Sequence, residues 1–238
     1  MKTFLQLSLL LMFAFPATAQ QQIENNFTNE PIATKLSETA VKADDAIWKS
    51  TQLGNLRNPE RPRRRQWTET AFLPVAGHQV ALLVQTPNRD NFLQNIHFFV
   101  RRDGNPQEKF RAIIYRVDKE TGLPGEVALK SDIALSGSVG NEWVSYDVSR
   151  FGITVPEEGL FITMGWSPEL VEERSYWNGG TKILADGQRL GASRIERGRE
   201  PYEGKVAIKF ETNAPWRFVG TPTAIMVPFI KSDIIERQ

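Results

Sequence analysis

The chain has 238 residues, with 29 Lys and Arg against 28 Asp and Glu, and its formal net charge is +1 at pH 7. A balance this close to neutrality provides no general attraction for nucleic acid or for an anionic membrane. The sequence contains no Cys, which excludes disulfide bonds, thiol nucleophiles and thiolate metal sites.

Residues 1–19 have the organisation of a signal peptide. Lys2 provides a positive start, Phe4–Phe15 is an apolar run, and Ala17–Ala19 has the small residues that signal peptidase requires. We predict cleavage before Gln20 and an exported protein, periplasmic or secreted, without a lipid anchor, because no Cys follows the cleavage site. The apolar run is short for a membrane span, so we expect no transmembrane segment after cleavage. The alternative, an N-terminal core helix, would leave this run without a polar face.

Residues 20–66 are polar and lack sustained apolar alternation, which predicts a partly disordered N-terminal arm. One or two helical turns are expected within Ser37–Lys49, where Ser37 would be the capping residue. A basic run in this arm contains Arg57, Arg61, Arg63, Arg64 and Arg65. The run is either a patch for phosphate or acidic glycan, or a solvated linker.

From Trp67 onward, short apolar segments alternate with turn residues. Phe110–Val117 carries apolar residues on both faces, which predicts a central strand, and Thr121–Gly125 has the composition of a turn. Further strands are predicted around Val80–Val84, Ile96–Val100, Val127–Leu135, Trp143–Val148, Phe151–Val155, Leu160–Trp166, Val206–Phe210, Trp216–Val219 and Ile225–Ile230.

About nine or ten strands with no amphipathic helix between them indicate an all-β fold. We predict an antiparallel two-sheet β-sandwich, jelly-roll-like, over residues 67–231, followed by a C-terminal tail at 232–238.

The order of these segments resembles an uncharacterised exported β-sandwich family of Gram-negative bacteria. The matching residues are Pro124-Gly125-Glu126, Trp143, Asp147-Val148-Ser149, Ile153, Val155-Pro156, Gly159 and Trp166. In that family the sandwich often follows a carboxypeptidase regulatory-like (transthyretin-like) domain, which is absent here because residues 20–66 are too few and too polar for it. The resemblance implies the fold and export, and it implies no catalytic residue.

The sequence offers little support for an enzyme. His78 and His97 are its two histidines and no HExxH motif occurs, so we interpret both as structural and expect no metal or other cofactor. Gly191–Ile195 and Gly165–Ser167 each lack part of a nucleophile elbow.

Carboxylates are candidates for two kinds of site. A glycosidase needs two facing carboxylates, and the sequence does not show which acids would face each other among Asp147, Glu157, Glu158, Glu172 and Glu173. A calcium site at strand ends would use Asp118, Asp132 and Asp186, but no EF-hand-type loop supports it.

The strongest candidate ligand-binding residues are aromatic. Tyr176 and Trp177 precede Asn178 in a Gly-rich segment, and Trp216 follows Pro215. Exposed aromatic rings stack on the apolar faces of sugars, and amides bind the hydroxyls. The alternative is that the rings fold back on the sandwich, since large aromatic side chains are usually mostly buried.

Three functional hypotheses follow. The first is a non-catalytic exported module that binds a ligand, with a glycan as the best candidate. The second is a structural or protein-interaction component of the cell envelope, and the third is a hydrolase with a dispersed carboxylate site. We expect no nucleic-acid partner.

Overall fold

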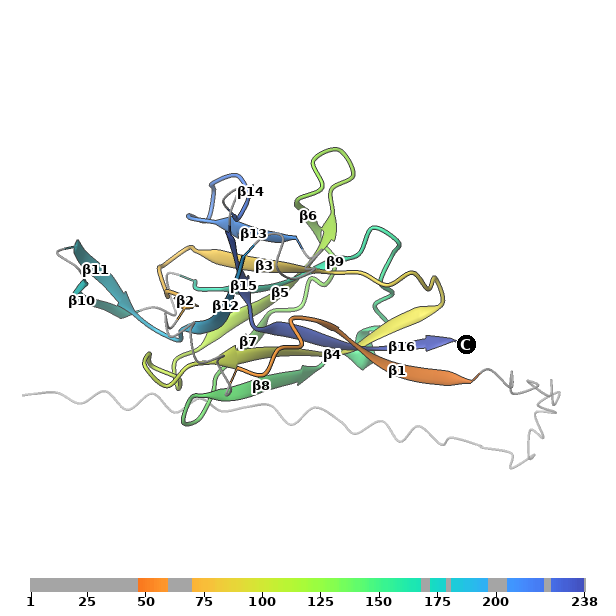
Figure 1. Cartoon of the computed structure of the whole chain (residues 1–238), viewed down its shortest axis with the longest axis horizontal. Coiled ribbons are helices and arrows are strands. Elements are labelled where there is room, and N and C mark those ends of the chain that lie inside the picture. Colours follow the sequence, from red (N-terminus) through yellow and green to blue (C-terminus); the bar gives the residue numbers. More distant parts are fainter. Residues whose placement is uncertain are drawn as a thin grey trace, which may run out of the picture. The chain divides into compact units, whose positions relative to one another are not determined.

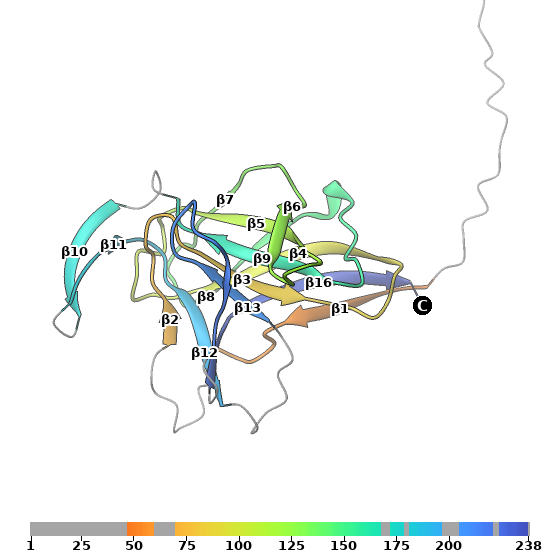
Figure 2. The same ribbon diagram turned by 90° about the horizontal axis from the view of Figure 1, so that it is seen from above.

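The structure is a computed structural model that describes residues 47–59, 70–167, 172–178, 181–196, 205–220 and 224–237. These residues form two seven-stranded antiparallel sheets, called sheet A and sheet B, and a separate two-stranded ribbon (Figure 1, Figure 2). A single 3₁₀ turn, η1 (Ser149–Phe151), accompanies them in the described segments. The predicted all-β, two-sheet antiparallel sandwich is therefore confirmed.

Sheet A is built around strand β4, which pairs with β8 on one edge and with β16 on the other. β16 in turn pairs with β1, and β12 joins β4 through Leu190 and Val100 and also pairs with β2 and β15. The strands of this sheet are β1 (Trp48–Gly54), β2 (Thr70–Phe72), β4 (Asn91–Val100), β8 (Glu142–Asp147), β12 (Leu190–Glu196), β15 (Ala224–Pro228) and β16 (Ile230–Arg237).

Sheet B is built around strand β9, which lies between β3 and β5. β5 pairs on its other edge with β6 and β7, so the predicted central position of Phe110–Val117 is confirmed. The strands are β3 (Gln79–Val84), β5 (Phe110–Val117), β6 (Pro124–Val127), β7 (Ile133–Leu135), β9 (Leu160–Gly165), β13 (Val206–Lys209) and β14 (Arg217–Phe218). The ribbon consists of β10 (Glu172–Asn178) and β11 (Thr181–Asp186), of which the backbone alone is described.

The chain crosses between the sheets repeatedly. β3 lies in sheet B, β4 in sheet A, β5 in sheet B, β8 in sheet A and β9 in sheet B. β6 and β7 stay beside β5 in sheet B before the chain crosses to β8, and these repeated crossings between two packed sheets fit the predicted jelly-roll-like sandwich.

The main core lies between the two sheets. Strand alternation points Ile96 and Phe98 of β4 toward Leu82 of β3 and Ile162 of β9, and all four side chains are fully buried. Trp166, which follows β9, is buried with them, and its indole N–H donates to the Gln188 carbonyl oxygen at 2.8 Å. Burying large apolar side chains stabilises the fold by roughly 1.5–3 kcal/mol each.

A second, smaller apolar cluster covers the outer face of sheet B. Ala81, Leu83, Tyr115, Phe161 and Ala207 form it. All six residues of β9 are consequently buried, because both faces of this strand are covered. A strand enclosed on both faces explains the continuous apolar run that the sequence shows there.

Two strands of the sandwich lie wholly or partly outside the span of 67–231 expected from the sequence. β1 lies within the expected arm at 20–66, and β16 occupies most of the expected tail at 232–238. β1 is an edge strand with few apolar residues, and β16 turns Ser232 and Glu236 inward. Thr86 and Asn88 donate hydrogen bonds to the Glu236 carboxylate, which offsets the cost of burying it. Because Ser232 and Glu236 are polar residues at inward positions, the sequence of β16 shows no regular apolar alternation.

Three local predictions also differ from the structure. Trp48 and Lys49 lie in β1 and not in a helical turn, and the rest of that predicted turn lies outside the described residues. Val127–Leu135 is not one strand: Val127 ends β6, residues 128–132 are irregular, and Ile133–Leu135 forms β7, which pairs with β5 separately from β6. The strand expected at Phe151–Val155 is η1 followed by irregular chain, in which Ile153 and Val155 still enter the core.

We expect Thr163→Val to raise the free energy of unfolding by about 1 kcal/mol. Thr163 is fully buried in β9, and among the described residues its Oγ1 has no hydrogen-bond partner. Valine has a similar shape, so the change removes a desolvated hydroxyl without opening a cavity. Urea unfolding should show a higher midpoint for Thr163→Val, whereas Thr163→Ala, the matched control, should be less stable than the Val variant. A Val variant below the wild type would contradict the prediction.

Candidate functional site

The outer face of sheet A carries a band of polar and aromatic side chains across β1, β16, β4 and β8, which lie side by side in Figure 1. Because Ile96 and Phe98 face the core, the residue between them, His97, faces outward. The strand register places His97 between Lys231 of β16 and Ser145 of β8. Residues distant in sequence are thus brought together by strand pairing alone.

His97 is the middle member of a hydrogen-bonded chain, which we call the Ser145–His97–Asp233 chain. His97 Nδ1 lies 2.6 Å from Ser145 Oγ, and His97 Nε2 lies 2.9 Å from Asp233 Oδ2. Asp233 also accepts hydrogen bonds from Gln52 Nε2 at 2.8 Å and Asn95 Nδ2 at 3.2 Å. The side chains of His97 and Asp233 are 12% and 16% exposed, whereas Ser145 is exposed. The chain therefore begins at the surface and ends at a well-held carboxylate.

The direction of these hydrogen bonds follows from the charge of Asp233. Burial alone would raise the pKa of this carboxyl, but hydrogen bonds from Gln52, His97 and Asn95 outweigh burial and hold its pKa below the ordinary value. An ionised carboxylate is only an acceptor, so His97 Nε2 donates to it. In the neutral ring Nδ1 is then the acceptor, and Ser145 donates its hydroxyl proton to His97.

Backbone geometry accounts for the short contact between His97 and Ser145. The Val148 N–H donates to the Gln94 carbonyl oxygen at 2.7 Å, so these residues are a hydrogen-bonded pair of β8 and β4. Pairs alternate along an antiparallel ladder, which makes His97 and Ser145 a non-hydrogen-bonded pair. Side chains approach most closely in such pairs.

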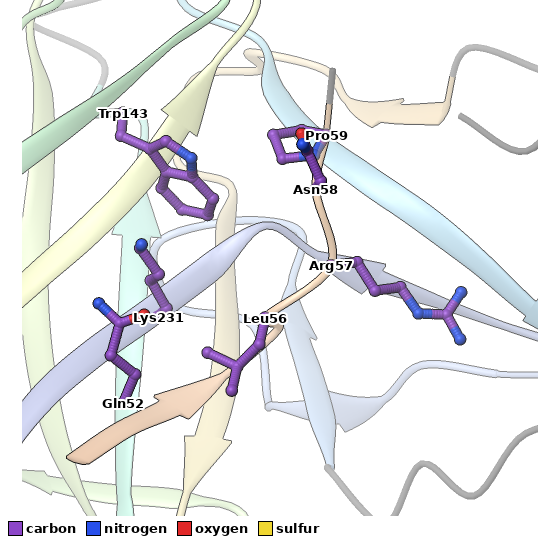
Figure 3. Close-up of a pocket in the computed structure, with 7 residues that line it drawn as sticks. All are labelled: Gln52, Leu56, Arg57, Asn58, Pro59, Trp143 and Lys231. Atoms are coloured by element: carbon purple, nitrogen blue, oxygen red, sulfur yellow. The ribbon is translucent and has the colours of Figure 1, made fainter. Parts of the chain in front are cut away.

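A pocket of about 310 Å³ lies beside the Ser145–His97–Asp233 chain on the same face (Figure 3). Seven residues line it: Gln52, Leu56, Arg57, Asn58, Pro59, Trp143 and Lys231. They contribute two cations, two amides and one indole, and no carboxylate. Gln52 belongs to both features, because its amide also binds Asp233.

One wall of the pocket is the segment after β1, and its path is set by Gly54 and Asn55. Gly54 has φ +104°, and a Cβ there would lie 2.6 Å from the Ile230 carbonyl oxygen, so glycine is required. Asn55 is buried, and its Nδ2 lies 3.1 Å from Ser193 Oγ and 3.2 Å from the Val227 carbonyl oxygen. This anchor fixes where residues 56–59 leave the sheet.

The opposite wall is Trp143, whose ring is held by aromatic neighbours. It makes edge contacts with Phe99 and Phe229, with ring centroids 5.6 and 6.5 Å away. Lys231 Nζ lies 4.7 Å from the centroid of the Trp143 ring. This distance is within the range of a cation–π interaction.

The residues singled out from the sequence lie elsewhere. Tyr176, Trp177 and Asn178 belong to β10, and their side chains are outside the described part of the structure. Trp216 is half-buried on the outer face of sheet B, where its ring meets Tyr115 edge-on at 5.5 Å. Trp216 is not among the residues that line the pocket beside Trp143.

Three of the candidate acids in the described segments have local structural roles. Glu157 pairs with Arg89 at 3.1 Å and Glu158 with Lys119 at 2.6 Å. Asp118 accepts two backbone N–H groups of the following turn. In the segments that the structure describes, no three His, Asp or Glu residues are placed to hold a metal ion.

Comparison with known proteins gives no relative. No family model, no curated protein and no solved structure matches the chain. The resemblance to the exported sandwich family therefore stays a prediction, as does export. Within the described segments no helix has the length and apolar character needed to cross a membrane.

We expect Asn55→Ala to lower the free energy of unfolding by roughly 1–3 kcal/mol, because it leaves buried carbonyl groups without their donor. The same substitution should free residues 56–59 and reduce any binding in the pocket. Chemical denaturation measures the first effect. Asn213→Ala, at an exposed turn position, is the matched control and should change stability by less than about 0.5 kcal/mol. Equal effects of the two substitutions would contradict the role of Asn55.

Proposed function

We propose that the protein is an exported binding module for a carbohydrate that carries an acidic group, and that the ligand occupies the pocket beside Trp143. The observation that carries this proposal is the combination of Trp143 and Lys231 with two amide side chains around one opening of about 310 Å³. That volume falls at the lower end of small-molecule pockets, which suits one or two sugar rings.

The aromatic and amide groups supply the features that a sugar needs. An indole offers an apolar face to the C–H face of a pyranose ring. Because Gln52 Nε2 is engaged by Asp233, Gln52 Oε1 is the atom available to accept a hydrogen bond from a sugar hydroxyl. The amide of Asn58 provides a further polar group at the rim.

The charge of the pocket selects an acidic carbohydrate over a neutral one. Lys231 lines the pocket, and no carboxylate is among the lining residues, whereas the guanidinium of Arg57 points away from Trp143 and Lys231 (Figure 3). The lysine ammonium offers a mobile positive charge and hydrogen-bond donors to a carboxylate. A uronic acid is a pyranose ring that carries a carboxylate, so its ring matches the indole of Trp143 and its carboxylate matches the ammonium of Lys231.

Lys231 links the binding of the acidic group to the stacking of the sugar ring on Trp143. Its ammonium lies over the Trp143 ring in the free protein, where a cation–π contact contributes about 0.5–1 kcal/mol at an exposed site. An incoming carboxylate exchanges that contact for a charge-assisted hydrogen bond of comparable or greater strength. The movement uncovers the ring face, on which the sugar then stacks.

The test is a glycan array probed with the mature protein, followed by titration of the best acidic and neutral ligands. Uronic-acid oligosaccharides should bind, with the tryptophan fluorescence of the protein changing on binding. Trp143→Ala and Lys231→Gln should each weaken binding by at least about tenfold, or 1.4 kcal/mol. Trp216→Ala and Trp177→Ala, which alter the residues favoured by the sequence, are the matched controls.

Each outcome of this experiment is decisive for the location of the site. Unchanged affinity in Trp143→Ala with loss in Trp177→Ala would return the site to β10. Equal affinity for neutral and acidic glycans would remove the role of Lys231. Absence of any glycan binding would leave the second candidate function.

That second candidate is an interaction component of the cell envelope, and edge strand β1 favours it. Among the described strands β1 pairs only with β16, so its other edge offers backbone groups to a partner strand. Trp48 at the start of β1 is 45% exposed and Ile47 is 69% exposed. A photo-crosslinking residue at position 48 should then give a discrete adduct in cells, and one at position 213 should not.

A further inference from the structure

We propose that Ser145 is the nucleophile of an ester-hydrolysing centre on the outer face of sheet A, with His97 as its general base and Asp233 as a positioning residue. The geometry is that of a continuous hydrogen-bonded chain, with 2.6 Å from Ser145 Oγ to His97 Nδ1 and 2.9 Å from His97 Nε2 to Asp233 Oδ2. A nucleophile, a base and a group that orients the base define such a site by geometry, whatever their order in the sequence. This inference does not depend on carbohydrate binding.

The arrangement sets the protons for nucleophilic attack. Asp233 is ionised, and donors from Gln52 and Asn95 hold its carboxylate in place. It therefore accepts the Nε2 proton of His97 and leaves the Nδ1 lone pair directed at the Ser145 hydroxyl. The three members lie on the neighbouring strands β8, β4 and β16, whose pairing limits how far they move apart.

Substrate reaches Ser145 from solvent, since this serine is exposed. The pocket residue Trp143 is two residues away on the same face of β8, or roughly 7 Å along the strand. The alcohol part of an ester can thus occupy the pocket while its acyl carbon lies at Ser145 Oγ. Ser145 lies on an exposed face, where a short acyl group needs no enclosing channel, so short acyl esters are the substrate class.

Two groups can stabilise the oxyanion that forms. Ser145 is in a non-hydrogen-bonded pair with His97, so its backbone N–H points away from β4, and in the described structure β8 has no strand on that side. Lys231 of β16 lies opposite His97 in the strand register. Its ammonium extends over the ring of Trp143, which lies on β8, the strand of Ser145. An N–H donor and an ammonium near the developing charge are the usual means of stabilising a tetrahedral intermediate.

The reaction follows in two balanced stages. Ser145 Oγ attacks the ester carbonyl carbon while its proton moves to His97 Nδ1, and the C–O bond to the alcohol then breaks as His97 returns this proton to the leaving oxygen. A water molecule next attacks the acyl-serine, giving one proton to His97 Nδ1, and Ser145 Oγ leaves with that proton. Ester and water become acid and alcohol, and the protein is restored.

The test uses the mature full chain with a fluorophosphonate probe and with p-nitrophenyl acetate. Peptide mass spectrometry should find the probe on Ser145, and turnover of the ester should exceed the buffer rate. Ser145→Ala should abolish labelling and lower turnover to background, and His97→Gln should lower turnover by at least about 100-fold. Ser50→Ala, which removes another exposed serine of sheet A, should leave both unchanged.

The role of Asp233 needs a separate readout. Asp233→Asn should lower kcat by at least about tenfold with KM unchanged, because substrate contacts are retained while the ring loses the partner that fixes its tautomer. A loss of kcat that is accounted for by a loss of thermal stability would indicate that Asp233 has a merely structural role. Turnover that survives Ser145→Ala, or a wild-type protein that neither labels nor turns over, would overturn the proposal.

Discussion

The pairing of β4 on both of its edges is the constraint on which the rest of the structure depends. Its inward residues, Ile96 and Phe98, are part of the main core, and the residue between them is His97. Side chains alternate strictly along a strand, so a shift of one residue would bury His97 and expose Ile96 and Phe98. The core therefore fixes the position of His97 more strongly than its own hydrogen bonds do, since each of these contributes only about 1 kcal/mol.

Sequence patterns predicted the parts of the fold in which burial follows the strand period. Phe110–Val117 carries apolar residues on both faces and lies inside sheet B, as expected. The pattern failed where polar side chains point inward, as Ser232 and Glu236 do in β16. It also failed for β1, which is an edge strand with one solvated face, so that no apolar period marks it. Alternation identifies a buried strand, but it does not identify a strand stabilised by paired polar groups.

The candidate site was less accessible to prediction than the fold. His97, Ser145 and Asp233 belong to three strands far apart in the sequence, and only the register of β8, β4 and β16 aligns them. The alternation of Trp143 and Ser145 with buried Val144 placed them together on one face, but it did not show that this face is the outer one. Trp143 and the fully buried Trp166 look alike in the sequence, and partner strands alone distinguish them.

Gln52 links the two proposals, and its hydrogen bonds limit what the pocket can bind. Its Nε2 donates to Asp233, which leaves Oε1 as its acceptor toward the pocket. Lys231 adds a cationic donor, so the pocket pairs an acceptor with a cationic donor, the pattern that suits a hydroxyl beside a carboxylate. A ligand that instead drew the Gln52 amide away would remove a donor from Asp233 and raise the pKa of this carboxyl toward its ordinary value. Ligands that accept from Gln52 are thus disfavoured by the same hydrogen bond that orients His97.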